Sequence, residues 1–177
     1  MTLNPKLTIG IPVYNGELFI KKAIESILAQ TFTDFELIIS DNSSTDSTPK
    51  ICQDFLNKDN RIQIFTQKKN IGIHRNFNFL LSQAKGEYFA WAAVDDHLDD
   101  DFMEKNLKVL ESNSSIVSSV GKIIPYGVDS LNIDSKLIDT SIFPKFLKNF
   151  IKHGRHKKMI DAGPVSGDIN SKIRTSF

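Results

Sequence analysis

The feature that most constrains the fold is a regular alternation of short apolar runs with stripes of apolar residues at helical spacing. The first run, LTIGIPV, is rich in β-branched residues and ends at Tyr14-Asn15-Gly16, a typical turn. A helical stripe follows each of the first four runs. Strands that alternate with helices favour a mostly parallel sheet covered by helices on both faces, an α/β architecture. The predicted strands cover residues 7–13, 35–39, 61–65, 88–94 and 116–124.

Local signals predict where several of the helices begin and end. Thr48 followed by Pro49 is typical of an N-cap with proline in the first helical position. Asp101 and Glu104 have the spacing of a capping box at the start of the fourth helix. Gly86 follows the third helical stripe, where a glycine commonly ends a helix.

Beyond residue 125 the alternation stops, and we expect a second region there. Residues 126–141 are polar and irregular, and residues 143–151 then form an amphipathic helical pattern followed by the basic tract HGRHKK. This helix has two interpretations. It could lie on an anionic membrane surface, or it could pack on the sheet or on a second copy of the chain as a homodimer. Packing is favoured, because helices that face a core show the same stripe.

Composition narrows the class of protein. The 177 residues include 22 Lys and Arg against 21 Asp and Glu, a net charge of +1, which argues against a general nucleic-acid binder. Cys52 is the only cysteine, so no internal disulfide is expected and a reducing compartment is favoured. The N-terminus lacks the pattern of a signal peptide, and no apolar run approaches the roughly 18 residues of a membrane span. The expected location is cytoplasmic, with the inner face of the membrane as an option.

Polar residues follow three of the predicted strands, at the ends where open parallel sheets bind ligands. Tyr14 is suited to stack on a base, and Asp41, in the stretch SDN, is suited to accept a hydrogen bond from a ring N–H. Asp95 and Asp96 are the oxygen ligands that Mg²⁺ or Mn²⁺ prefers, with phosphate oxygens completing the shell. Together these residues predict a site for a nucleoside diphosphate and its metal.

Each of these features also has a plainer interpretation. Residues 41–48 could be a solvated turn and helix cap. Asp95 and Asp96 could cap the next helix, although the acids at 99–101 lie nearer to it. Adjacent carboxylates repel unless water or a cation compensates them, which favours a metal. His97 is a possible further ligand or an ordinary surface residue.

Two longer stretches resemble a known family. IPVYNGELFIKKAIESILAQTFTDFELIISDNSSTDST resembles the opening of family-two glycosyltransferases of the GT-A fold. NIGIHRNFNFLLSQAKGEYFAWAAVDDH is similar to the segment that leads into their metal-binding aspartates, and the resemblance covers residues 6 to 112. It implies a Rossmann-like α/β/α sandwich. It also implies transfer of a sugar from a nucleotide diphosphate sugar to an acceptor hydroxyl, generally with inversion.

The resemblance implies roles for particular residues on the nucleoside side of the site. Pro12, Tyr14 and Asn15 would line the nucleoside pocket, with Tyr14 against the base. Asp41 would recognise the edge of the base. Residues 1–125 would then form the donor-binding domain.

On the diphosphate side, the resemblance places Asn70 and Arg75 near the ribose or diphosphate. Asp95 matches the last acid of the Asp-x-Asp motif and would bind Mn²⁺ or Mg²⁺. Asp96 would support the metal or reach the donor sugar. The first acid of the motif falls on Ala93, so one expected contact is missing. The arginine often found before the third helix falls on Phe77.

The catalytic base and the acceptor are less well defined. The family carries its base beyond the fifth strand, and we find no match for it in residues 126–177, an incomplete or diverged acceptor-side region. Asp161 and Asp168 are the only acids in the last stretch and are the candidates. The family suggests a saccharide or lipid-linked acceptor in polysaccharide or glycolipid synthesis. The alternative function is a truncated, non-catalytic module that binds nucleotide sugar. A sugar nucleotidyltransferase is disfavoured, because the turn after the first strand is not a glycine-rich basic loop.

Overall fold

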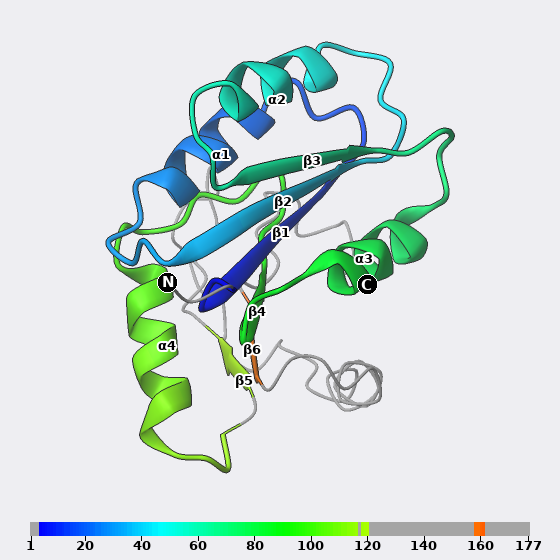
Figure 1. Cartoon of the computed structure of the whole chain (residues 1–177). Helices are drawn as coiled ribbons and strands as arrows, with labels where there is room; N and C mark the ends of the chain where they lie inside the picture. The colour runs from blue at the N-terminus through cyan, green and yellow to red at the C-terminus, as the bar shows by residue number, and fades with distance from the viewer. Residues whose placement is uncertain (1–3, 117, 121–157, 162–177) are drawn as a thin grey trace, which may run out of the picture.

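The computed structural model describes residues 4–116, 118–120 and 158–161, and its centre is a sheet with the strand order β3-β2-β1-β4-β6-β5 (Figure 1). Every pair of neighbouring strands in this sheet is parallel. The predicted parallel α/β fold is therefore confirmed. The strands are β1 (Leu7–Val13), β2 (Phe35–Asp41), β3 (Ile62–Thr66), β4 (Tyr88–Trp91), β5 (Ser118–Val120) and β6 (Lys158–Asp161).

Helices cover both faces of the sheet, as the alternation predicts (Figure 1). Helices α1 (Ile20–Leu28), α2 (Thr48–Leu56) and α4 (Phe102–Ser112) pack on one face, where their apolar residues share a core with Leu7, Ile9 and Ile11 of β1. Helix α3 (Ile73–Gln83) covers the other face. Within residues 4–116, none of these helices combines the length and the apolar character needed to cross a membrane.

Gly86 has a different role from the predicted one. Helix α3 ends at Gln83, and the next residue, Ala84, is extended, so no glycine ends this helix. Instead, a Cβ atom added to Gly86 would lie 2.5 Å from the backbone nitrogen of Thr8. Glycine is needed because the chain passes this close to β1. The N–H of Gly86 also donates to Thr8 Oγ1 at 2.8 Å.

The predicted cap of α2 is wrong, and the predicted cap of α4 is right in its position but not in its hydrogen bonds. Ser47, not Thr48, occupies the N-cap position of α2. Asp101 occupies the N-cap position of α4, but its side chain makes no capping hydrogen bond. Glu104 does not complete a capping box, because its carboxylate accepts hydrogen bonds from Thr31 and Lys108. The Asp101 carboxylate instead pairs with Lys105 Nζ, one turn along the same helix, at 2.6 Å.

Two differences concern the strands. Strand β4 ends at Trp91, three residues before the predicted end at Val94. Strand β6 was not predicted, yet it lies between β4 and β5 and pairs with both. The region assigned to the acceptor side thus contributes a strand to the same sheet, and the boundary near residue 125 stays a prediction. The amphipathic pattern at 143–151 lies outside the described residues.

Candidate functional site

The chain order changes direction between β1 and β4. From β1 the chain runs outward to β2 and β3, and it then returns past β1 to form β4. Loops that leave such a switch point in opposite directions open a crevice at the carboxyl ends of the strands. The loops after β1 and β4 meet there, since a Cβ added to Gly16 would lie 2.9 Å from Val94 Cγ2. Asp41 at the end of β2 is in register with Val13. The three polar strand ends therefore lie at one edge, as the sequence predicts.

Hydrogen bonds join the loop after β1 to the loop after β2. Asn15, in a left-handed conformation with φ of 52°, accepts the N–H of Thr45 at 2.8 Å and donates its own N–H to Ser44 Oγ at 2.8 Å. The N–H of Gly16 donates to Thr48 Oγ1 at 2.8 Å. The Asn15 side chain is thus committed to shaping this edge of the site.

Asp46 and Glu17 extend the same junction. The N–H of Glu17 donates to Asp46 Oδ2 at 3.0 Å, and the N–H of Ser47 donates to Glu17 Oε2 at 2.8 Å. The pKa of the Asp46 carboxyl lies below its ordinary value. Desolvation is the largest single effect and acts to raise this pKa, but hydrogen bonds from Thr48 and from the backbone N–H of Glu17 together lower it by more.

Asp41 lies at the predicted place but is fully buried. Its two carboxylate oxygens accept the N–H of Ser44 at 3.1 and 3.4 Å. Ser43, between them, has a φ of 67°, in the left-handed region that few residues other than glycine adopt. A carboxylate has about four acceptor positions, so Asp41 retains capacity for a ligand N–H. Because Asp41 has no exposed surface, a base can reach that capacity only if residues that cover it move.

Asn70 is held in place by a residue to which the sequence pattern assigned no role. Asn42, buried next to Asp41, donates to Asn70 Oδ1 at 3.1 Å and accepts the N–H of Ile71 at 2.8 Å. Asn70 Oδ1 also accepts the N–H of Gly72 at 2.9 Å. The only sequence signal for Asn42 is its place in the polar stretch that ends β2. This contact shapes the turn that leads into α3.

The two adjacent aspartates after β4 lie in different environments. Asp95 is exposed, whereas Asp96 is 3% exposed and its Oδ2 accepts the N–H of Ala93 at 3.1 Å. No group of three or more His, Cys, Asp or Glu side chains is placed to hold a metal ion within the described part of the chain. Asp95 supplies the hard oxygen donor that Mg²⁺ or Mn²⁺ requires, but it supplies only one carboxylate. These residues fit a metal that brings most of its ligands as diphosphate and water.

Tyr14 and Arg75 are exposed, as Asp95 is, and so are Asn15 and Asn70. The Tyr14 side chain is 49% exposed at the end of β1, and Arg75 is exposed on the first turn of α3. Pro12 is part of β1, in register with Ser40. Asn15, Asp41, Asn70 and Asp96 each accept a backbone N–H group, and of these four only Asp41 and Asp96 are buried.

Of the two candidates for the catalytic base, one lies within the described residues and one does not. Asp161 is the last residue of β6, in register with Trp91 at the end of β4. Its backbone thus lies at the same edge of the sheet as the loop that carries Asp95. Asp168 lies outside the described residues.

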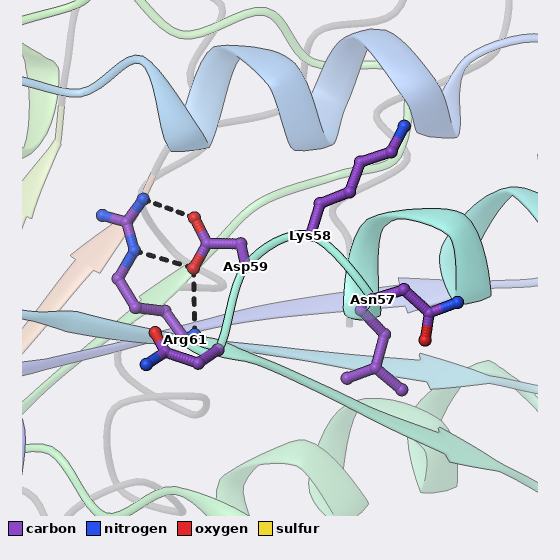
Figure 2. Close-up of a pocket in the computed structure, with 6 residues that line it drawn as sticks. Asn57, Lys58, Asp59 and Arg61 are labelled. Atoms are coloured by element: carbon purple, nitrogen blue, oxygen red, sulfur yellow. Dashed lines mark hydrogen bonds and ion pairs between the residues drawn. The ribbon is translucent and has the colours of Figure 1, made fainter.

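A surface depression at residues 56–61 lies away from this edge (Figure 2). It sits where α2 leads into the amino end of β3, at the opposite edge of the sheet. Asp59 and Arg61 face each other there, with Asp59 Oδ2 2.7 Å from a guanidinium nitrogen. The two charged side chains of the depression thus pair with each other within one loop, so we do not assign a ligand to this depression.

Comparisons with known proteins agree with this geometry. A GalNAc(5)-diNAcBac-PP-undecaprenol beta-1,3-glucosyltransferase of Campylobacter jejuni is 39% identical over 95 residues, which cover 53% of this chain and 31% of the relative. The crystal structure of Staphylococcus aureus TarS 1–349 in complex with UDP superposes with a TM-score of 0.64 at 25% identity, covering 72% of this chain and 38% of the 1–349 chain.

A third protein shares the fold. The mannosyltransferase PcManGT of Pyrobaculum calidifontis, in complex with GDP-Man and Mn²⁺, superposes with a TM-score of 0.62 at 22% identity, covering 69% of this chain and 37% of PcManGT. This chain spans 15% to 49% of the length of its curated relatives. The family description "Glycosyl transferase family 2" matches residues 8–166. The chain therefore belongs to glycosyl transferase family 2.

Proposed function

We propose that this chain binds a nucleotide diphosphate sugar and transfers its sugar to an acceptor hydroxyl. The observation that carries the proposal is the meeting of the loops after β1 and β4 at the switch point, with an exposed aromatic ring on one side and an exposed carboxylate on the other. The family match supports it, as do the nucleotides bound in the structural neighbours TarS and PcManGT.

The nucleoside would occupy the part of the edge formed by β1 and β2. The exposed ring of Tyr14 can stack on the base, a contact worth about 1–3 kcal/mol. Pro12 and Asn15 would line the pocket, and Asp41 would recognise the edge of the base once the turn at 43–44 opens. Asn70 and Arg75, on the loop after β3 and the start of α3, would approach the ribose or diphosphate.

The diphosphate would lie toward Asp95. When bound, Mn²⁺ or Mg²⁺ would neutralise the negative charge that grows on the leaving diphosphate. Asp95 would hold that cation from the protein side as its single carboxylate ligand. This arrangement predicts that the metal binds well only with the nucleotide, because the phosphate oxygens supply much of its shell.

An inverting transfer needs a base that takes the proton of the acceptor hydroxyl as it attacks the anomeric carbon. We propose Asp161 for this role before Asp168, since β6 ends at the edge that carries Asp95. The acceptor would be a saccharide or lipid-linked sugar in polysaccharide or glycolipid synthesis. A cytoplasmic location, dimerisation and contact with the membrane face remain parts of this proposal.

The test is a calorimetric titration of UDP-, GDP- and dTDP-sugars with and without Mn²⁺, on the wild type and on Asp95→Ala. We expect one nucleotide class to bind, with Mn²⁺ tightening binding at least about tenfold, or about 1.4 kcal/mol. Asp95→Ala should remove the gain from Mn²⁺ while leaving metal-free binding unchanged. Nucleotide binding that ignores both Mn²⁺ and Asp95 would rule out the metal-dependent site.

Product formation in the same samples separates an enzyme from the alternative, a binding module without turnover. With acceptor present, Asp161→Asn should lower kcat by at least about a hundredfold, the usual contribution of a general base. Asp168→Asn is the matched comparison and should keep its activity. Binding without product in the wild type would favour the non-catalytic alternative.

A further inference from the structure

We propose that Asp96 is a positioning residue, which holds the turn that presents Asp95, and that it is not a ligand of the metal or the donor sugar. The inference rests on the proposed function, since it concerns how the same site is built. It departs from the role implied by the family resemblance, in which Asp96 supports the metal or reaches the sugar.

The turn at residues 93–96 is closed by two hydrogen bonds between its ends. The N–H of Asp96 donates to the carbonyl of Ala93 at 3.2 Å, and the N–H of Ala93 donates to Asp96 Oδ2 at 3.1 Å. The second bond turns the Asp96 carboxylate back toward the end of β4. With 3% of the residue exposed, Asp96 is a buried member of the loop.

The bond to Ala93 lies just beyond the end of β4. The N–H of Ala92, the first residue after the strand, donates to the carbonyl of Gly10 in β1 at 3.1 Å. Ala93 comes next, and the Asp96 carboxylate accepts its N–H. A backbone N–H near the protein interior needs such an acceptor. Asp96 therefore completes the sheet's hydrogen bonding at the point where the chain turns away.

Asp95 lies inside this turn, and its neighbours on both sides are anchored. Val94 approaches Gly16 of the loop after β1, and Leu98 is buried in the core. Only Asp95 among residues 94–96 is exposed. The closed turn thus sets the direction of the one outward carboxylate. It also explains how a site with Ala93 in place of an acid still aims a carboxylate at the crevice.

The two roles make opposite predictions for Asp96→Asn. An asparagine keeps a side-chain oxygen that can accept the N–H of Ala93 but removes the negative charge. If Asp96 positions Asp95, the nucleotide affinity of Asp96→Asn in Mn²⁺ should stay within about threefold of the wild-type affinity. A small loss is expected because a neutral amide oxygen accepts the N–H of Ala93 more weakly than a carboxylate does. Asp96→Ala should weaken nucleotide affinity at least about tenfold, because it removes the acceptor. If Asp96 binds the metal, Asp96→Asn should lose as much affinity as Asp95→Asn.

Amide hydrogen exchange of Ala93, followed by NMR without metal or nucleotide, provides a reading that does not depend on activity. The amide should be protected in the wild type and in Asp96→Asn, and it should exchange at least about tenfold faster in Asp96→Ala. Asp100→Asn removes an exposed acid from the same loop and is the matched control. It should change neither the nucleotide affinity in Mn²⁺ nor the exchange rate of the Ala93 amide. Thermal unfolding of every variant checks that the fold is kept.

The outcomes separate this inference from the proposed function. Equal losses of affinity in Asp96→Asn and Asp95→Asn, or unchanged Ala93 exchange in Asp96→Ala, would overturn the positioning role. Absence of nucleotide binding in the wild type would overturn the proposed function and, with it, the role of the turn in presenting a metal ligand. The exchange data would then still report whether Asp96 closes the turn.

Discussion

At the residue scale, the side chains that face outward and those that accept backbone N–H groups carry different expectations. Tyr14 and Asp95 reach solvent, so their replacement should change ligand binding and leave folding unchanged. Asn15 and Asp41 each accept an N–H from the loop at residues 42–47, so their replacement should change the loop itself. Affinity and stability measured on the same variants distinguish the two groups.

Tyr14→Ala should weaken nucleotide binding by about 5- to 150-fold, because it removes a stacking surface worth about 1–3 kcal/mol per base. Tyr14→Phe keeps the ring and should bind as the wild type does. The midpoint of thermal unfolding should hardly move in either variant, since the side chain is half exposed. Titration calorimetry and a thermal melt check both statements, and equal affinity in Tyr14→Ala and Tyr14→Phe would contradict stacking.

Asp46 makes the stability of this edge depend on pH. Its pKa is lower in the folded chain than its ordinary value of 3.8. A depressed folded pKa stabilises the protein above the unfolded pKa of about 3.9, and that stability is lost as the pH falls through the folded pKa. The free energy of unfolding should therefore fall less steeply below about pH 4 in Asp46→Asn than in the wild type. Urea unfolding between about pH 2 and 6 measures the two slopes, and identical slopes would refute the assignment.

At the element scale, a side-chain hydrogen bond from Gly16 to Thr48 joins the start of α2 to the loop after β1. Thr48 is fully buried, and its hydroxyl accepts the N–H of Gly16, whereas its own N–H donates to Asp46. One residue at the first turn of a helix thus connects two of the loops that form the site. The geometry of the edge depends on this connection and not on the intrinsic helical preference of α2.

Thr48→Val should destabilise the fold by about 1–3 kcal/mol, because it leaves the buried N–H of Gly16 without its acceptor. Thr48→Ser retains the hydroxyl and should lose much less. Chemical denaturation of both variants gives the difference. A Thr48→Val variant as stable as the wild type would show that the fold does not depend on the hydroxyl as an acceptor for Gly16.

At the scale of the whole molecule, β6 joins the two regions that the sequence separates. Its four residues occupy the position between β4 and β5, more than 30 residues beyond β5 along the chain. Without β6, strand β4 would present an unpaired edge, which favours aggregation. The part of the sheet formed by β1 and β4 is therefore completed by a strand from beyond residue 125.

A chain cut after residue 125 should fold less stably than the full chain or aggregate, because β4 loses one of its two neighbouring strands and β5 loses the strand that joins it to the sheet. Size-exclusion chromatography and thermal unfolding of residues 1–125 against 1–177 test this. A soluble monomer with an unchanged unfolding midpoint would instead support a self-sufficient domain that ends near residue 125.

Local patterns in the sequence predicted most of the fold. The seven residues of β1 and the starts of β2 and β4 were read from apolar runs, because a buried parallel strand needs an apolar residue at nearly every position. Strand β6 was missed, since four residues carry too little pattern and the strand forms only by pairing with distant partners. A distant partner also determines the bond of Thr48, whose hydroxyl accepts the N–H of Gly16. Asp101 occupies its predicted N-cap position but pairs with Lys105 of the same helix.

The sequence by itself determined the order of the elements from β1 to β5, the parallel sheet and the edge at which polar residues gather, because these follow from local periodicity and from the direction of parallel strands. Only the tertiary structure decided which of those polar residues face a ligand. Asp95 and Asp96 are chemically identical neighbours, yet one is exposed and the other accepts the N–H of Ala93. That difference arises because the backbone N–H of Ala93, just after β4, needs an acceptor and finds it in Asp96. No local pattern in AWAAVDDH predicts this contact.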